Sequence, residues 1–181
     1  MKNQSLEQLK YPIGKAKIPT AITLQHIQEW LIILEEFPQK LTLLVSNLDD
    51  KQLATPYRPG GWTIRQVIHH LADSHLHSYI RFKWALTENK PTIKAYDEQQ
   101  WAELHDAKNA PILLSLNALA ATHAKLVYLL KDLSEIELEK AFIHPETGSE
   151  VALNKNIGIY AWHSQHHYAH IENRMILNGW K

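Results

Sequence analysis

Residues 59–81 read PGGWTIRQVIHHLADSHLHSYIR, and this stretch decides the fold because it contains the start and the apolar face of a long helix. Thr63 and Gln66 match the T-x-x-Q capping box, so we expect a helix from Thr63 to about Leu86. The glycine pair before it marks a turn. One face of the helix is apolar and must pack on other elements; it consists of Ile64, Val67, Leu71, Phe82 and Ala85.

The same helix carries histidines whose direction follows from the helical period. His70 lies about 60° from Val67 and is expected to face inward, whereas His69 points roughly 160° away and is expected to face outward. Ser74 and His77 continue the His70 edge at i+4 and i+7. Taken alone, His70 fits a hydrogen-bonded core histidine better than a metal ligand. Its interpretation depends on partners from another helix.

Apolar periodicity predicts further long helices. One begins at Thr23 and is kinked or restarted at Pro38. Another begins after Pro111, because proline suits the first position of a helix. This helix carries His123 in its apolar row, where a core role and a role near a metal both remain open.

The remaining segments connect or cover these helices. Residues 1–22 are expected to form an extended arm rather than a helix, because prolines restrict them. Residues 87–110 lack a sustained period and predict a partly helical connection. Two short segments flank residues 145–149, which predicts a small hairpin or an ordered loop. Asn154 or Asn156 can then cap a last helix, expected to end near Asn178-Gly179. Four long helices predict an all-α bundle.

The last helix contains a histidine cluster, WHSQHHYAH, at residues 162–170. His163, His167 and His170 fall within roughly 60° of one another and form one stripe. His166 lies about 60° off the stripe and pairs at i+4 with His170, so two alternative pairs exist. Imidazoles at i and i+4 can both bind one ion, which predicts half of a metal site. A third histidine from another helix would complete it, and His70 is available.

Composition narrows the possible functions. The 181 residues suit one domain, residues 1–181, and 19 basic and 19 acidic residues cancel, so nothing favours nucleic acid or anionic lipid. The chain has no cysteine, which leaves histidine and carboxylate as metal ligands. The first residues lack the apolar core and the small-residue cleavage site expected of a signal peptide, and there is no continuous run of about 18 apolar residues. We therefore expect a cytoplasmic protein that uses a small-molecule substrate and neither nucleic acid nor membrane.

Several motifs together resemble YfiT-like members of the DinB superfamily over nearly the whole chain. They are Tyr11-Pro12-Ile13-Gly14, the segment 59–81, Tyr96-Asp97, His144-Pro145 and Tyr160-Ala161-Trp162-His163. The resemblance implies an up-and-down four-helix bundle that holds one divalent ion, zinc or nickel, through three histidines. Carried over by position, the first ligand is the histidine eight residues after Trp62, which is His70. The C-terminal pair is His163 and His167.

The resemblance also implies an enzyme. Members are described as metal-dependent hydrolases, in which the ion lowers the pKa of water from about 15.7 toward about 7 and makes it a nucleophile. Others resemble thiol S-transferases that use bacillithiol, mycothiol or glutathione, whose substrate thiol would bind as thiolate. Family members are often homodimers. A non-catalytic metal-binding or small-molecule-binding protein is the third alternative, because no H-E-x-x-H glutamate is present.

Other residues are candidates for supporting roles. The candidates for binding a substrate carboxylate are Arg81, Lys94 and Arg174. The candidates for proton transfer are Asp73, His77, Tyr96 and His123. Trp62 and Trp162 suit packing near the site. The histidines without a place in the family motif are His69, His166 and His170. Because histidine binds metal only when neutral, occupancy is expected to fall between roughly pH 8 and 5.

Overall fold

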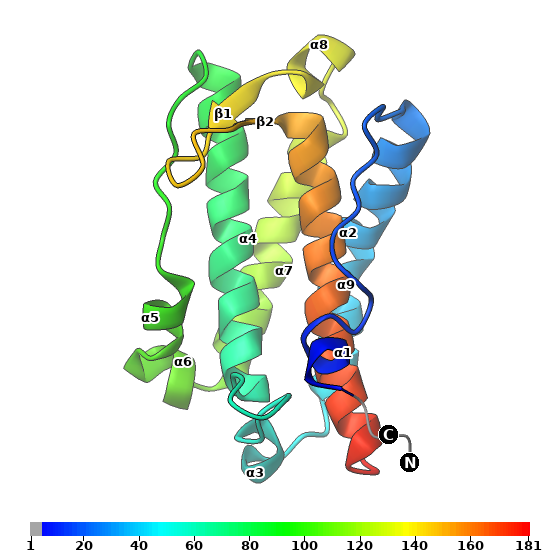
Figure 1. Cartoon of the computed structure of the whole chain (residues 1–181), viewed down its shortest axis with the longest axis vertical. Coiled ribbons are helices and arrows are strands. Elements are labelled where there is room, and N and C mark those ends of the chain that lie inside the picture. Colours follow the sequence, from blue (N-terminus) through cyan, green and yellow to red (C-terminus); the bar gives the residue numbers. More distant parts are fainter. Residues whose placement is uncertain (1–4) are drawn as a thin grey trace.

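Four long helices form the structure, a computed structural model that describes residues 5–181 (Figure 1). They are α2 (Leu24–Val45), α4 (Ile64–Thr87), α7 (Ile112–Leu130) and α9 (Leu153–Leu177). α2 and α4 each pack against both α7 and α9, so the four helices enclose one interior. The predicted four-helix bundle is confirmed, with one refinement. α4 and α7 run in the same direction, because residues 88–111 return along the bundle (Figure 1).

Short elements connect the long helices. They are α1 (Leu6–Lys10), α3 (Asp50–Leu53), α5 (Glu98–Ala102), α6 (His105–Asn109), α8 (Glu135–Leu138), β1 (Ala141–Ile143) and β2 (Glu150–Ala152). The predicted hairpin is present, since β1 pairs antiparallel with β2. The predicted partly helical connection is also present, because residues 87–110 contain the short helices α5 and α6. Both pack on α4.

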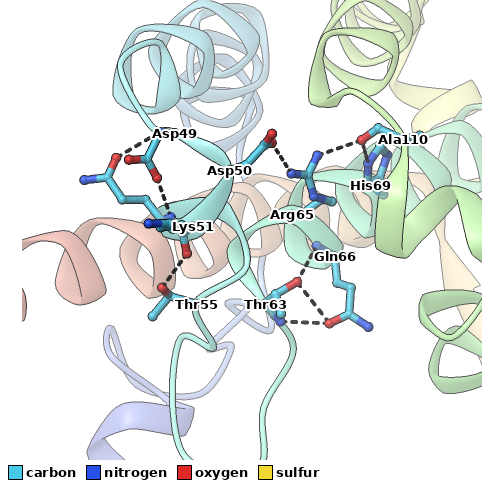
Figure 2. Close-up of polar contacts among 10 residues, drawn as sticks. Asp49, Asp50, Lys51, Thr55, Thr63, Arg65, Gln66, His69 and Ala110 are labelled. Atoms are coloured by element: carbon cyan, nitrogen blue, oxygen red, sulfur yellow. Dashed lines mark hydrogen bonds and ion pairs between the residues drawn. The ribbon is translucent and has the colours of Figure 1, made fainter.

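The start of α4 is built as the sequence predicts (Figure 2). The Thr63 hydroxyl accepts the Gln66 N–H at 3.2 Å, and the Gln66 side-chain carbonyl accepts the Thr63 N–H at 2.9 Å. Arg65, which lies between these two residues, donates to Asp50 at 2.7 Å and to the carbonyl of Ala110 at 2.9 Å. The first turn of α4 is thereby joined to α3 and to the segment that precedes α7.

Two expectations about helix starts are wrong. The arm was expected to contain no helix, yet α1 forms a single turn in which Ser5 and Gln8 make a capping box. Residues 1–4 of the arm lie outside the described part of the chain. Neither Asn154 nor Asn156 caps α9, because α9 follows β2 directly and its N-cap, Ala152, makes no side-chain bond. Asn156 lies inside the helix and is buried.

Pro38 lies inside α2, which continues from Leu24 to Val45 without a restart. Proline has no backbone N–H, so the carbonyl of Leu34, four residues earlier, loses its usual helical donor. A carbonyl buried in the bundle needs another partner. In this chain that partner is His123 on α7, whose Nδ1 lies 2.6 Å from the Leu34 oxygen.

The apolar core is divided along the bundle axis. One cluster fills one end and includes Leu34, Phe82 and Ile157, and the other fills the opposite end and includes Leu41, Ile64 and Ile171. Along α4, α7 and α9, several histidines fall between the residues of the two clusters; these are His75, His123, His163, His166, His167 and His170. The bundle therefore holds a layer of imidazoles near its middle.

The apolar composition of α7 reflects its place in the bundle. By length and composition alone, Ile112–Leu130 is long and apolar enough to cross a membrane. Its buried residues, however, face α2 and α4; they include Leu116, Leu119, Leu126 and Leu130. Core packing explains this row of leucines.

Gly158 sets how closely α9 approaches α2. A Cβ atom at this position would lie 2.8–2.9 Å from three ring atoms of Trp30. Helix propensity alone favours Gly158→Ala by about 1 kcal/mol, whereas overpacking costs typically about 1–3 kcal/mol. We expect Gly158→Ala to lower the free energy of unfolding by up to about 2 kcal/mol in urea titrations. Adding Trp30→Leu should recover part of that loss; a variant more stable than the wild type would contradict this packing argument.

Candidate metal centre

Three imidazoles meet where α4 faces α9. One ring nitrogen from each of His70, His163 and His167 lies within 4.8 Å of the other two. Nε2 of His70 and Nε2 of His163 are 3.2 Å apart. Two nitrogens bound tetrahedrally to zinc at about 2.0–2.1 Å lie roughly 3.3 Å apart, so this spacing fits a shared ion. The structure thus brings together the three histidines that the sequence singled out.

Burial keeps these imidazoles neutral. It lowers the pKa of His70 to about 4. It lowers the pKa of His163 and of His167 well below the ordinary histidine value, and neighbouring histidines add to the effect. A neutral imidazole is the form that binds metal, so the three side chains are ready for an ion at neutral pH.

A fourth histidine, His75, was not predicted from the sequence. It is fully buried, and its Nε2 lies 3.1 Å from Nδ1 of His163. Its other nitrogen, Nδ1, lies 2.9 Å from Nε2 of His123. The sequence contained a signal for it, since His75 stands at i+4 from Leu71 and seven residues before Phe82, within the apolar face of α4.

His69 does not face outward, and that expectation is wrong. The side chain is buried, with Nδ1 2.7 Å from the Ser115 hydroxyl and Nε2 3.2 Å from the carbonyl of Ala110. The start of α7 and the segment before it cover this side of α4, which periodicity within one helix cannot reveal. Both ring nitrogens are engaged there, as Figure 2 shows for the Ala110 carbonyl.

The other two histidines of the α9 cluster lie beside the three. His170 contacts His167, with their Nδ1 atoms 3.3 Å apart, and its Nε2 lies 3.0 Å from the carbonyl of Lys10 at the end of α1. His166 stacks on Trp162 with ring centroids 4.4 Å apart. The stripe predicted for His163, His167 and His170 is therefore continuous in space.

A polar pocket of about 420 Å³ opens onto the three histidines. Four buried nitrogens have no hydrogen-bond partner within the described residues, and the side chains that carry all four line this pocket. They are Nε of Arg81, Nδ1 of His144, Nε1 of Trp162 and Nδ1 of His166. Buried polar atoms normally have partners, so their convergence here indicates a place for a polar ligand. A larger groove of about 600 Å³ between α2 and α7 contains none of the three histidines.

The three basic residues that are candidates for binding a substrate carboxylate lie in different places. Arg81 lines the pocket, and its Nη1 donates to the hydroxyl of Tyr160 at 3.4 Å. Arg174 instead donates to the carbonyl of Tyr57 at 3.1 Å, away from the pocket. Lys94 is exposed and does not line the pocket. Of the three, only Arg81 is placed to contact a ligand.

The candidates for proton transfer also differ in whether they line the pocket. Tyr96 lines the pocket, and its hydroxyl lies 3.5 Å from Nδ1 of His70. His77 stacks on Tyr96, with centroids 4.3 Å apart, and donates from Nδ1 to the backbone carbonyl of Asp73 at 2.8 Å. Burial raises the pKa of Asp73 to about 6, with Asp106 adding to the rise. Asp73 itself does not line the pocket.

The two tryptophans pack at the edge of the site. Trp62 lies against His70 with ring centroids 4.7 Å apart, and Trp162 lies against His166. Both also line the pocket. Their rings therefore cover the imidazoles from outside, in agreement with the packing role expected from the sequence.

Curated proteins closely similar to this chain come from several bacilli. A protein of Oceanobacillus iheyensis is 51% identical over 171 residues, which cover 94% of this chain and 98% of the relative. A protein of Bacillus cereus is 52% identical over 175 residues, covering 97% of this chain and all of the relative. Both carry names that propose, without establishing, a metal-dependent hydrolase.

Solved structures agree with this relationship. YfiT from Bacillus subtilis superposes with a TM-score of 0.94 at 46% identity, covering 96% of this chain and 99% of YfiT; it is described as a probable metal-dependent hydrolase with an unusual four-helix bundle topology. A mycothiol-dependent maleylpyruvate isomerase, at 17% identity and a TM-score of 0.59, covers 77% of this chain and shares the fold alone. The sequence profile of the DinB superfamily matches residues 33–171. The chain belongs to the DinB superfamily.

Proposed function

We propose that this protein is a metal-dependent hydrolase of a small polar molecule, with His70, His163 and His167 holding one zinc or nickel ion. The observation that carries the proposal is the meeting of three neutral imidazoles that line one polar pocket. A set of nitrogen ligands without thiolate suits either ion. The names of the close relatives support the same class of enzyme.

The chain's own residues supply binding and orientation. A divalent ion in this position acts as a Lewis acid that lowers the pKa of a water or thiol that reaches it. Arg81 presents an unpartnered N–H to an anionic group of the substrate, and Trp162 presents a second donor. Glu98 and Glu146 also line the pocket and can accept a proton from the attacking group.

A thiol S-transferase is the second candidate, and Arg81 favours it. Low-molecular-weight thiols commonly carry carboxylates, and the guanidinium is placed to bind one within the same pocket as the three histidines. Because the chain has no cysteine, the thiol would have to come from the substrate. The same three ligands serve both reactions.

Paired activity panels separate these two functions. The zinc-loaded and the nickel-loaded protein should be incubated with a set of esters and amides, and in parallel with thiols and electrophiles. Turnover confined to the esters and amides supports the hydrolase, and turnover confined to thiol conjugation supports the transferase. Metal binding without turnover in either panel would favour the non-catalytic alternative.

Metal content tests the ligand assignment. The wild type should bind about one equivalent of zinc or nickel, whereas His70→Ala and His163→Ala should lose most of it because two imidazoles hold an ion weakly. His77→Ala is a matched control, since His77 lies on the same helix but outside the three. Elemental analysis after gel filtration measures this. A full equivalent retained by His163→Ala would show that the ligands are misassigned. Chelation should also lower the melting temperature, because the ion binds only the folded chain.

The pH dependence of metal affinity should differ from that of free histidine. With ordinary pKa values of about 6.5, three histidines would lose roughly 70-fold in affinity already at about pH 6. Because burial lowers the pKa of His70 to about 4, and holds the pKa of His163 and of His167 well below the ordinary histidine value, few protons compete above about pH 5. We expect less than tenfold change between about pH 8 and 6, and a steep fall below about pH 5.

Circular dichroism at each pH provides the control for unfolding. The lowered histidine pKa values mean that the unfolded chain takes up protons that the folded chain refuses, so stability falls as the pH drops below about 6.5. Affinity should therefore be measured only where the helical signal is intact. A loss of affinity that begins near pH 7 in fully folded protein would contradict the buried, neutral site.

A further inference from the structure

A neutral imidazole has one N–H and one lone pair, so the partner of one ring nitrogen fixes the state of the other. Backbone carbonyls can only accept. A histidine whose first nitrogen contacts a carbonyl must therefore carry its proton there and its lone pair on the second nitrogen. This rule can be followed through the buried histidines of the bundle, because burial keeps them neutral.

The first series of hydrogen bonds starts at Leu34 on α2. Its carbonyl accepts from Nδ1 of His123 at 2.6 Å, so Nε2 of His123 carries a lone pair. That lone pair accepts from Nδ1 of His75 at 2.9 Å, which leaves a lone pair on Nε2 of His75. This in turn accepts from Nδ1 of His163 at 3.1 Å. The lone pair of His163 is therefore on Nε2, the atom that lies 3.2 Å from Nε2 of His70.

The Leu34 carbonyl, at which this series of contacts begins, lacks a helical donor for a reason visible in the sequence. In a regular helix the N–H of residue 38 would bond to the carbonyl of Leu34, but Pro38 has no N–H. Pro38 thus exposes an acceptor inside the bundle, opposite His123. The proline and the histidine come from different helices and serve one hydrogen bond.

A second series of hydrogen bonds starts at Lys10 in the N-terminal arm. Lys10 is the last residue of α1, where helix carbonyls have no intrahelical partner. Its carbonyl accepts from Nε2 of His170 at 3.0 Å, so Nδ1 of His170 carries a lone pair. That lone pair accepts from Nδ1 of His167 at 3.3 Å. The lone pair of His167 is therefore also on Nε2.

We propose that the carbonyls of Leu34 and Lys10 fix the tautomers of His163 and His167, so that both ligands present a lone pair on Nε2 before any ion arrives. His75, His123 and His170 are positioning residues that transmit this constraint. The proposal deepens the metal site proposed above and depends on it for its consequence in metal affinity. His69 provides the contrast, since its two nitrogens are engaged by Ala110 and Ser115 and leave none for an ion.

The tautomers can be measured directly in metal-free protein. Long-range proton–nitrogen NMR spectra of protein labelled with nitrogen-15 in histidine, assigned by single variants, show which ring nitrogen carries each proton. We expect the proton on Nδ1 in His75, His123, His163 and His167, and on Nε2 in His69 and His170. A proton on Nε2 of His163 or His167 would overturn the proposal. This measurement needs no metal, so it judges the tautomers even if the metal site proves wrong.

Variants at His123 test the consequence for binding. His123→Leu removes both contacts and should weaken zinc affinity about 10- to 100-fold, the usual effect of losing an outer partner of a ligand. His123→Gln should stay within a few fold of the wild type, because its amide can donate to Leu34 and accept from His75. Competition titration against a chelator of known affinity measures both.

A packing control separates positioning from stability. Leu126→Ala, also buried on α7, should lower the melting temperature without changing the tautomer of His163 or the zinc affinity of the folded protein. Equal losses of affinity in His123→Leu and His123→Gln would overturn the positioning role, as would unchanged affinity in His123→Leu. If the wild type binds no zinc, the metal site fails, and the NMR spectra alone decide the tautomers.

Discussion

The central constraint on this structure is that imidazoles buried among helices need acceptors, and helices use up their own carbonyls. A buried N–H without a partner destabilises the fold by about 1–3 kcal/mol. In the bundle two carbonyls without helical donors accept these bonds. One is that of Leu34, made available by Pro38 within α2, and the other is that of Lys10 at the end of α1. The two apolar clusters can then close above and below five histidines, each with a ring nitrogen that has a partner; these are His75, His123, His163, His167 and His170.

Much of the fold could be predicted because its signals are local. The capping box at Thr63 and Gln66 and the spacing of His163 and His167 depend only on contacts within one helix, and periodicity describes these well. The single turn of α1 was missed although Ser5 and Gln8 carry the same capping pattern, because the nearby prolines suggested an extended arm. The sequence predicts Asn154 or Asn156 as the cap of α9 because it does not show that β2 continues directly into this helix.

The errors around the site have a different cause, since they depend on contacts between helices. His69 was placed in solvent because the rest of α4 cannot show that the start of α7 covers it. The sequence did not predict a role for His75, because it lies among the apolar residues of α4 and not on the edge shared by His70 and Ser74. His75 is placed to act on the site only through its contacts with His123 and His163 on two other helices, and no spacing within one segment encodes that arrangement.

The contact between His170 and Lys10 joins residues that are 160 positions apart in the chain. During synthesis the arm leaves the ribosome first and the helix that carries His163, His167 and His170 leaves last. The first three long helices therefore emerge with only His70 of the three proposed ligands, and the Lys10 carbonyl meets His170 only after α9 has been synthesised. Under the proposed assignment an ion would bind late, because a nascent chain lacks two of the three proposed ligands until α9 has been synthesised.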